Sequence, residues 1–144
     1  MAVADPHRLQ RFVVAQDADG TYAAALAQLR RGRKTGHWMW FVLPQLAGLG
    51  RSEMSRRYSI SGLAEARAYL DHPVLGARLR ECAMALLQLG VDRTAVEVLG
   101  AVDALKLRSS MTLFARAAPQ EDLFKLVLER FFDGAPDPAT DARL

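Results

Sequence analysis

The segment PVLGARLRECAMALLQLG (residues 73–90) decides the fold class of this chain. Its apolar residues return at alternating intervals of four and three positions, which is the period of a helix with one buried face. They are Leu75, Leu79, Cys82, Leu86 and Leu89. Pro73 is tolerated in the first turn of a helix and Gly90 is a typical C-terminal stop, so the segment predicts one long amphipathic helix.

Helical patterns also precede this segment. Asp5, followed by a proline, is an expected N-cap for the first helix. A second helix is expected over residues 21–31, with Gly32 as its stop. Ser52 and Ser61 are expected N-caps of two further helices, which brings the pattern up to the quoted segment.

The same signals follow the segment. Thr94 has a glutamate three residues later, the spacing of a capping box, and Gly100 is expected to end the short helix that it starts. Asp103 is an expected N-cap for the next helix, and Pro119 is expected to open the last one. The alternation that marks β-strands is almost absent.

We therefore expect an all-α fold: one compact domain over residues 1–144, built from about seven to eight short helices without a sizeable sheet. Residues 134–144 are rich in proline, aspartate and alanine, and we expect them to form a loosely packed tail.

Composition narrows the class of protein. The chain has 51% hydrophobic and 24% charged residues, which is typical of a folded globular domain. Its single cysteine excludes an internal disulfide framework and indicates a reducing compartment. The start lacks a signal-peptide pattern and no apolar run is long enough to span a bilayer, so we expect a cytoplasmic protein without a membrane partner. The three histidines lack metal-ligand spacing, so neither a metal nor a cofactor is expected.

Positive charge is concentrated in one stretch, although the net charge is only +3. Between Gly20 and Ser52 there is no aspartate or glutamate, while five basic side chains fall in that window. They are Arg30, Arg31, Arg33, Lys34 and Arg51. An anion is the natural partner of such a window, and a solvated basic loop is the alternative.

Both tryptophans of the chain lie in the same window, a few residues after Lys34. Residues 38–43 are continuously apolar, and we expect a short buried helix there with Thr35 as its N-cap. Trp38 and Trp40 are either core anchors or the lining of a cavity, because their indole N–H groups need partners. Gln45 could present an amide to a ligand or cap a turn. His37 is the histidine next to both features and is the acid–base candidate.

A second polar cluster lies in DALKLRSSMTLF (residues 103–114). On a helix, Asp103, Lys106 and Ser110 share one face, and they could bind a polar ligand or activate Ser110 through Lys106. The structural alternative is that Asp103 caps the helix, Lys106 is solvated, and Ser109 and Ser110 only pack. The catalytic candidates are thus His37, Lys106 and Ser110.

With these motifs the chain resembles the domain of unknown function 1810 family, a group of small, mostly helical bacterial proteins. The resemblance rests on HWMWF-x-x-PQL-x-GLG and D-x-x-K-x-x-SSMTLF and covers residues 9–134. It implies a compact helical fold and no established reaction. The family pattern falls on Gln16, Lys34, His37, Trp38, Trp40, Pro44, Gln45, Gly48, Leu49, Gly50, His72, Pro73, Asp103, Lys106, Ser109, Ser110, Met111, Thr112 and Phe114. The family usually has serine where this chain has Gly36, so a role of that side chain would be lost or pass to Thr35.

Our leading hypothesis is a pocket that binds, and could process, a phosphorylated or nucleotide-like small molecule. A phosphate would meet Arg33 and Lys34, and a flat ring would stack on Trp38 or Trp40. The ligand-binding residues expected for this pocket are Arg33, Lys34, His37, Trp38, Trp40, Gln45, Asp103, Lys106, Ser109 and Ser110. The hypothesis requires the two polar segments to meet in space.

Two other functions stay open. Residues 30–51 could bind nucleic acid, although no DNA- or RNA-reading motif is present and the last third of the chain is net acidic. An exposed aromatic segment could instead anchor a protein partner. The sequence does not specify the oligomeric state or a reaction.

Overall fold

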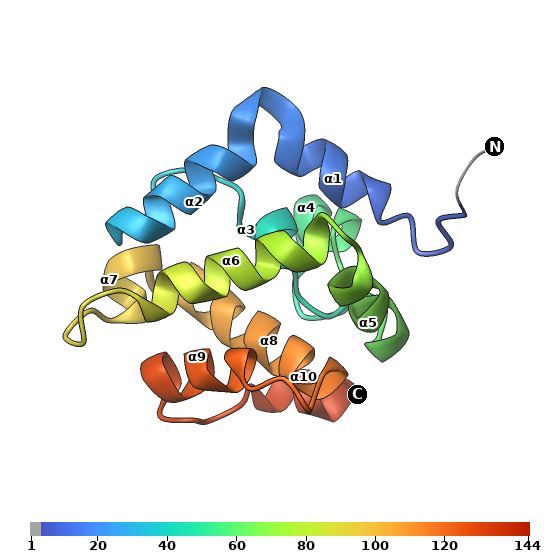
Figure 1. The fold of residues 1–144 in the computed structure, drawn as a ribbon. Helices are drawn as coiled ribbons and strands as arrows, with labels where there is room; N and C mark the ends of the chain where they lie inside the picture. The colour runs from blue at the N-terminus through green and yellow to red at the C-terminus, as the bar shows by residue number, and fades with distance from the viewer. Residues whose placement is uncertain (1–3) are drawn as a thin grey trace.

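The computed structural model describes residues 4–144. Residues 1–3, the beginning of the stretch that lacks a signal-peptide pattern, lie outside the described part. The described chain is all-α and forms one domain, as predicted (Figure 1). Its elements are α1 (Gln10–Asp17), the 3₁₀ turn η1 (Ala18–Gly20), α2 (Thr21–Arg31), α3 (Met39–Val42), α4 (Glu53–Arg57), α5 (Leu63–Asp71), α6 (Leu75–Leu87), α7 (Ala95–Leu99), α8 (Ala101–Ala117), α9 (Leu123–Phe132) and α10 (Pro138–Arg143). No helix in residues 4–144 is long and apolar enough to cross a membrane.

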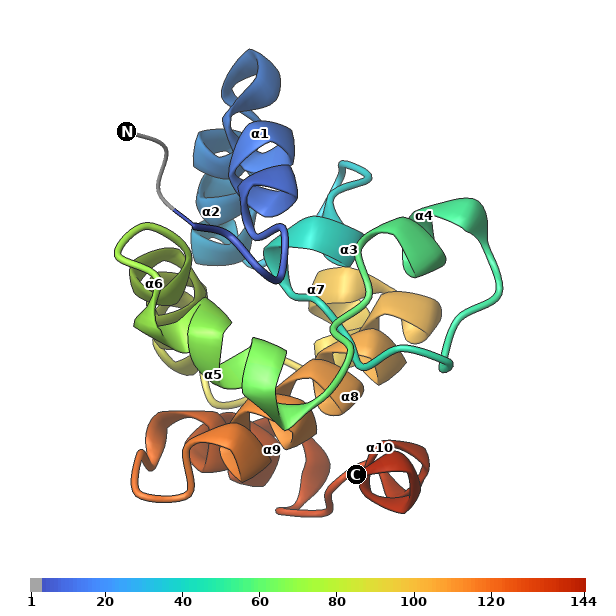
Figure 2. The same ribbon diagram turned by 90° about the vertical axis from the view of Figure 1, so that its right-hand side faces the viewer.

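Helix α8 is the centre of the fold. It packs against α5, α7, α9 and α10, while α6 lies between α2 and α9. The two amino-terminal helices α1 and α2 form an arm over α6, on the opposite side from α9 (Figures 1 and 2). Because α8 touches four elements, most of its side chains are buried, which explains why its sequence lacks a wide solvent-facing stripe.

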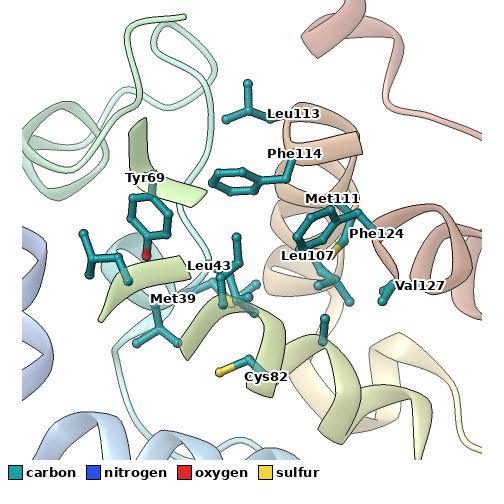
Figure 3. Close-up of a cluster of buried hydrophobic side chains, with 14 of the residues drawn as sticks. Met39, Leu43, Tyr69, Cys82, Leu107, Met111, Leu113, Phe114, Phe124 and Val127 are labelled. Atoms are coloured by element: carbon teal, nitrogen blue, oxygen red, sulfur yellow. The ribbon is translucent and has the colours of Figure 1, made fainter. Parts of the chain in front are cut away.

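The core includes the stripe predicted for residues 73–90, which is buried along α6, and it extends onto α8. Leu107, Met111 and Phe114 of α8 are fully buried, and Phe114 lies between the rings of Tyr69 and Phe124, with ring centroids 5.4 and 5.9 Å apart (Figure 3). These aromatic contacts join α8 to α5 and α9. The helical spacing of apolar residues in the sequence therefore predicted the faces that pack together.

Several helix ends also match their sequence signals. Helix α2 ends at Gly32, whose φ of 78° is the left-handed conformation that favours glycine. Thr94 forms the predicted capping box and Ser52 caps α4 through its hydroxyl. Helix α6 ends at Leu87, before the predicted stop. Ser61 does not cap α5: its N–H and hydroxyl both donate to Glu65, and glycine occupies the cap position.

The expected loose tail is instead a packed helix. Asp137 caps α10 by accepting from the N–H and the hydroxyl of Thr140, which is fully buried. Arg116 of α8 donates to both carboxylate oxygens of Asp141, each at 2.9 Å. The composition is typical of disordered chain, but aspartate followed by proline is a helix start, and α8 supplies the contacts that keep it folded. This additional helix is one reason why the described residues contain ten α-helices rather than seven to eight.

A single β-bridge is the only strand-like pairing in residues 4–144. It joins Leu46 to Ile60, with hydrogen bonds from Ala47 N–H to Ile60 O (2.8 Å) and from Ile60 N–H to Gln45 O (2.9 Å). The bridge holds the segment after α3 against the segment that connects α4 to α5. It therefore fixes the position of Gln45, which the sequence suggested as a ligand contact.

Candidate functional site

The two polar segments of the sequence meet at one carboxylate. Lys34, in the loop between α2 and α3, places its Nζ 2.9 Å from Oδ2 of Asp103. Lys106, one turn further along α8, places its Nζ 3.4 Å from Oδ1 of the same side chain. Asp103 is not an N-cap, because α8 starts at Ala101 after Gly100, so its carboxylate is free to pair with both lysines.

The loop before α3 is shaped by side chains that the sequence reading did not single out. Oε1 of Gln28 accepts from Thr35 N–H, Gly36 N–H and the indole N–H of Trp38, at 3.0, 3.2 and 2.8 Å. Lys34 donates through its backbone N–H to Val98 O and through Nζ to Gly36 O. Thr35 is not the cap of α3, since Trp38 occupies that position. No local motif marks Gln28, which lies within α2.

Each lysine also lies over a tryptophan ring. Lys34 Nζ is 5.1 Å from the ring centroid of Trp38, and Lys106 Nζ is 4.9 Å from that of Trp40. Both distances are within the range of cation–π attraction. The side chain of Lys34 is only 8% exposed, whereas those of Asp103 and Lys106 are 18% and 19% exposed. The three charges therefore form a largely buried cluster, here named the lysine–aspartate cluster.

The tryptophans belong mainly to the core. Trp38 is 2% exposed and its N–H is already satisfied, so it offers no face for stacking on a ligand ring. Trp40 is partly buried and packs against the core cluster. An exposed aromatic anchor for a protein partner is therefore not formed by this pair.

The absence of a side chain at Gly36 matters for this packing. A Cβ at this position would lie 2.9 Å from Cδ1 of Trp38, closer than real contacts allow. The glycine lets the indole pack against the loop backbone. A serine there would require the ring or the loop to shift.

A cleft of about 260 Å³ opens beside Lys106, between α8, the segment after α3, and α10. We name it the α8 cleft. Its α8 wall consists of Val102, Leu105, Lys106 and Ser109. The other walls consist of Gln45, Leu49, Gly50, Ser55, Asp137 and Ala139. Three of the expected ligand contacts, Gln45, Lys106 and Ser109, thus lie around one cavity.

The small polar residues of α8 also hold the tail. Ser109 Oγ donates to Oδ2 of Asp137 at 3.0 Å, and the N–H of Asp137 donates to Oγ1 of Thr112 at 2.8 Å. Asp137 thereby becomes a wall of the α8 cleft. The sequence reading missed it because the tail was expected to pack loosely.

The other expected residues are not brought into the cleft. Ser110 is fully buried and its hydroxyl has no hydrogen-bond partner within the described residues, so it is not paired with Lys106. Arg33 and His37 are exposed in the loop before α3 and do not line the cleft. The geometry for activating Ser110 through Lys106 is therefore not formed.

The cysteine behaves as its apolar surroundings indicate. Burial raises the pKa of the Cys82 thiol to about 12, although the thiol also donates weakly to the hydroxyl of Tyr22. A thiol with this pKa is almost entirely protonated at neutral pH and is a poor nucleophile. Among residues 4–144, no three histidine, cysteine or carboxylate side chains gather closely enough to hold a metal ion.

Comparison with known proteins gives a family and a fold but no activity. The family model described as "Protein of unknown function (DUF1810)" matches residues 6–144. The crystal structure of the conserved hypothetical protein Rv1873 from Mycobacterium tuberculosis is 49% identical, with a TM-score of 0.93 over 97% of this chain and 98% of that chain. A search of curated proteins gave no match.

Proposed function

The chain belongs to the DUF1810 family of proteins of unknown function, and we propose that it binds a small anionic molecule in the α8 cleft. One observation carries the proposal: two lysines share one carboxylate in the lysine–aspartate cluster. The cluster therefore has one positive charge in excess. Lys106 shares its counter-ion Asp103 with Lys34, and Asp137 on the opposite wall makes no ion pair with it among the described residues, so an anionic group next to Lys106 would be stabilising.

The excess positive charge lies at the α8 cleft because Lys106, and not Lys34, lines that cavity. Lys34 is nearly closed off from solvent and also donates to a backbone carbonyl, so its charge is used inside the fold. Lys106 lines the cleft and is the more exposed of the two. The anionic group of a ligand would thus meet Lys106 rather than the Arg33–Lys34 pair that the sequence favoured.

The size of the cleft limits the ligand. At about 260 Å³ it is slightly smaller than the ~300–1,000 Å³ of pockets that enclose drug-sized molecules. A sugar phosphate or hydroxy acid fits this scale better than a complete dinucleotide. The proposal therefore keeps the anionic small molecule that the sequence predicted and favours one smaller than a dinucleotide.

The opposite wall favours a ligand that also carries hydroxyl groups. Asp137 can accept hydrogen bonds, and three bonds already converge on one of its two oxygens, Oδ2. Gln45 adds an amide that can donate or accept, and Ser55 adds a hydroxyl. A hydroxylated anion would match a cation at one end and acceptors at the other. The proposal is one of binding and names no reaction.

The test is a thermal-shift and calorimetry screen of the full chain with sugar phosphates and hydroxy acids. Lys106→Gln removes the charge at the cleft, and Lys125→Gln is the matched control because Lys125 lies on α9 and donates to Pro119 O. We expect a saturable ligand whose affinity falls at least about tenfold in Lys106→Gln and is unchanged in the control, since a charge-assisted bond contributes about 1.5–3 kcal/mol. Gln45→Ala, which leaves the lysine–aspartate cluster intact, should weaken the same ligand.

Equal affinity for Lys106→Gln and the wild type would refute the proposal. So would a screen in which none of these compounds raises the melting temperature of the wild type.

A further inference from the structure

A second cavity, of about 280 Å³, has four arginines among its ten lining residues. It lies between the amino-terminal turn, α4 and the start of α5. Arg8, Arg11, Arg56 and Arg57 line it, and it shares no lining residue with the α8 cleft. We name it the arginine cavity. The sequence reading did not identify it, because its arginines come from two segments about 45 positions apart and outside the acid-free window.

Arg11 and Glu65 form the fixed base of this cavity. The guanidinium of Arg11 donates to the backbone oxygens of His7, Arg8, Arg57 and Ser59, and to the carboxylate of Glu65 at 3.0 Å. Glu65 is buried and also accepts from the N–H and hydroxyl of Ser61. The hydrogen bonds of Arg11 and Glu65 join three segments of the chain, and the charges of the two side chains cancel.

The other three arginines have no such partner. The ion pairs of the described residues, taken to 4.0 Å, include Arg11 but not Arg8, Arg56 or Arg57. Arg57 instead lies over the ring of Tyr58, 5.5 Å from its centroid. Glu53, one turn before Arg57 on α4, makes no ion pair at this distance. Four arginines and a single carboxylate, that of Glu65, therefore line one small cavity, which leaves an excess of three positive charges around it.

The backbone that presents Arg8 is held in place. Its φ of 51° lies in the left-handed region, which residues other than glycine rarely adopt. The N–H of Arg8 donates to Asp5 O and its carbonyl accepts from Arg11, both at 3.0 Å. Unusual backbone conformations that the surroundings enforce are concentrated at ligand sites. The amino-terminal turn thus places Arg8 at the same cavity as Arg56 and Arg57 of α4.

We infer that the arginine cavity is an anion site that takes a terminal phosphate group, independently of the ligand in the α8 cleft. Guanidinium forks match the oxygens of phosphate in pairs, and a dianion would offset most of the excess charge. The cavity is concave and the arginines face one small volume instead of following a line across the surface. This arrangement suits a compact phosphate monoester better than the extended backbone of a nucleic acid.

The test measures binding to the full chain at low ionic strength. The probes are inorganic phosphate, glycerol phosphate and a single-stranded oligonucleotide without terminal phosphates. Titrations are followed by calorimetry and by the NMR signals of the arginine side-chain N–H groups. The double substitution Arg56→Gln/Arg57→Gln removes two forks from the cavity. Arg31→Gln/Arg33→Gln removes the same charge from exposed arginines outside it.

We expect saturable binding of phosphate and glycerol phosphate that is at least tenfold weaker in Arg56→Gln/Arg57→Gln and unchanged in Arg31→Gln/Arg33→Gln. Arg8→Gln, whose side chain makes no ion pair, should weaken binding as well, and Lys106→Gln should not. Equal loss in both double variants would show attraction to net charge alone and would overturn the inference. No saturable binding, or binding of the oligonucleotide alone, would overturn it too.

Discussion

Replacing Asp103 by asparagine tests the central claim about the lysine–aspartate cluster. Asparagine keeps the shape of the side chain but removes the one negative charge that two lysines share. Lys34 would then be a nearly buried ammonium without a charged partner, left with neutral groups such as a backbone carbonyl and the Trp38 ring. The protein should fold, but with a lower free energy of unfolding.

The size of the effect follows from the geometry. At an effective dielectric constant of about 20, ion pairs at 2.9 and 3.4 Å have Coulomb energies of roughly 6 and 5 kcal/mol. The measurable loss is smaller, because removal of the carboxylate also removes its desolvation cost. Breaking a buried pair typically costs about 3–5 kcal/mol, and partial exposure of Asp103 and Lys106 places the expected loss near the lower limit, about 3 kcal/mol.

Urea unfolding at neutral pH measures this loss directly. A double-mutant cycle with Lys34→Met separates the pair from general damage, because methionine keeps the aliphatic stem and removes the buried charge. We expect Asp103→Asn combined with Lys34→Met to cost less than the sum of the two single changes by at least about 1.5 kcal/mol. Lys106→Gln alone should cost about 1 kcal/mol, since Asp103 keeps Lys34. If Asp103→Asn lost less than about 1 kcal/mol with an unchanged urea dependence, Lys34 would not depend on this carboxylate and the reasoning would fail.

Three further predictions concern stability and reactivity. Ser110→Ala should raise the free energy of unfolding by about 0.5–1 kcal/mol in urea unfolding, because it removes a buried hydroxyl that has no partner among the described residues, and because alanine is the better helix former. An unchanged or lower free energy of unfolding would contradict this. Cys82 should not react with a thiol reagent in the native protein at about pH 8 and should react fully in urea, because burial raises its pKa to about 12. The hydrogen bonds from Arg116 hold the pKa of Asp141 below its ordinary value of 3.8, so its contribution to stability is present above that pH and is lost as the pH falls through the folded value. Wild type and Asp141→Asn should therefore differ in melting temperature at about pH 5, and the difference should shrink once the pH falls below the ordinary value of 3.8; a constant difference would contradict the ion pair.

The sequence predicted the fold well because helix formation in this chain depends on local signals. Apolar spacing identified the buried face of α6, and glycine or capping residues marked the ends of α2 and α7. The prediction failed where contacts between residues distant in the sequence determine the role of a side chain. Asp103 pairs with lysines instead of capping, and Gln28 organises a loop seven to ten residues away.

Long-range contacts also limited the prediction of the site. Charge spacing indicated that Lys34 and Lys106 lie near a ligand, but it could not show that they share a counter-ion. A basic window in sequence is also not a basic surface in space: Lys34 is buried in an ion pair while Arg33 stays exposed. The arginine cavity was missed because a tertiary fold, rather than a motif, collects its side chains.

The polar residues of α8 show that a packing role and a role in the ligand site can belong to the same side chains. Ser109 was expected to contact a ligand, yet Ser109 and Thr112 both bind Asp137 and so hold the start of α10. The same bonds place Asp137 in the wall of the α8 cleft, opposite the excess charge of Lys106. The packing role of these hydroxyls is thus also what completes the cavity. It follows that a chain lacking residues 134–144 would lose one wall of the cleft together with the helix, so ligand binding in the cleft has to be measured on the full chain.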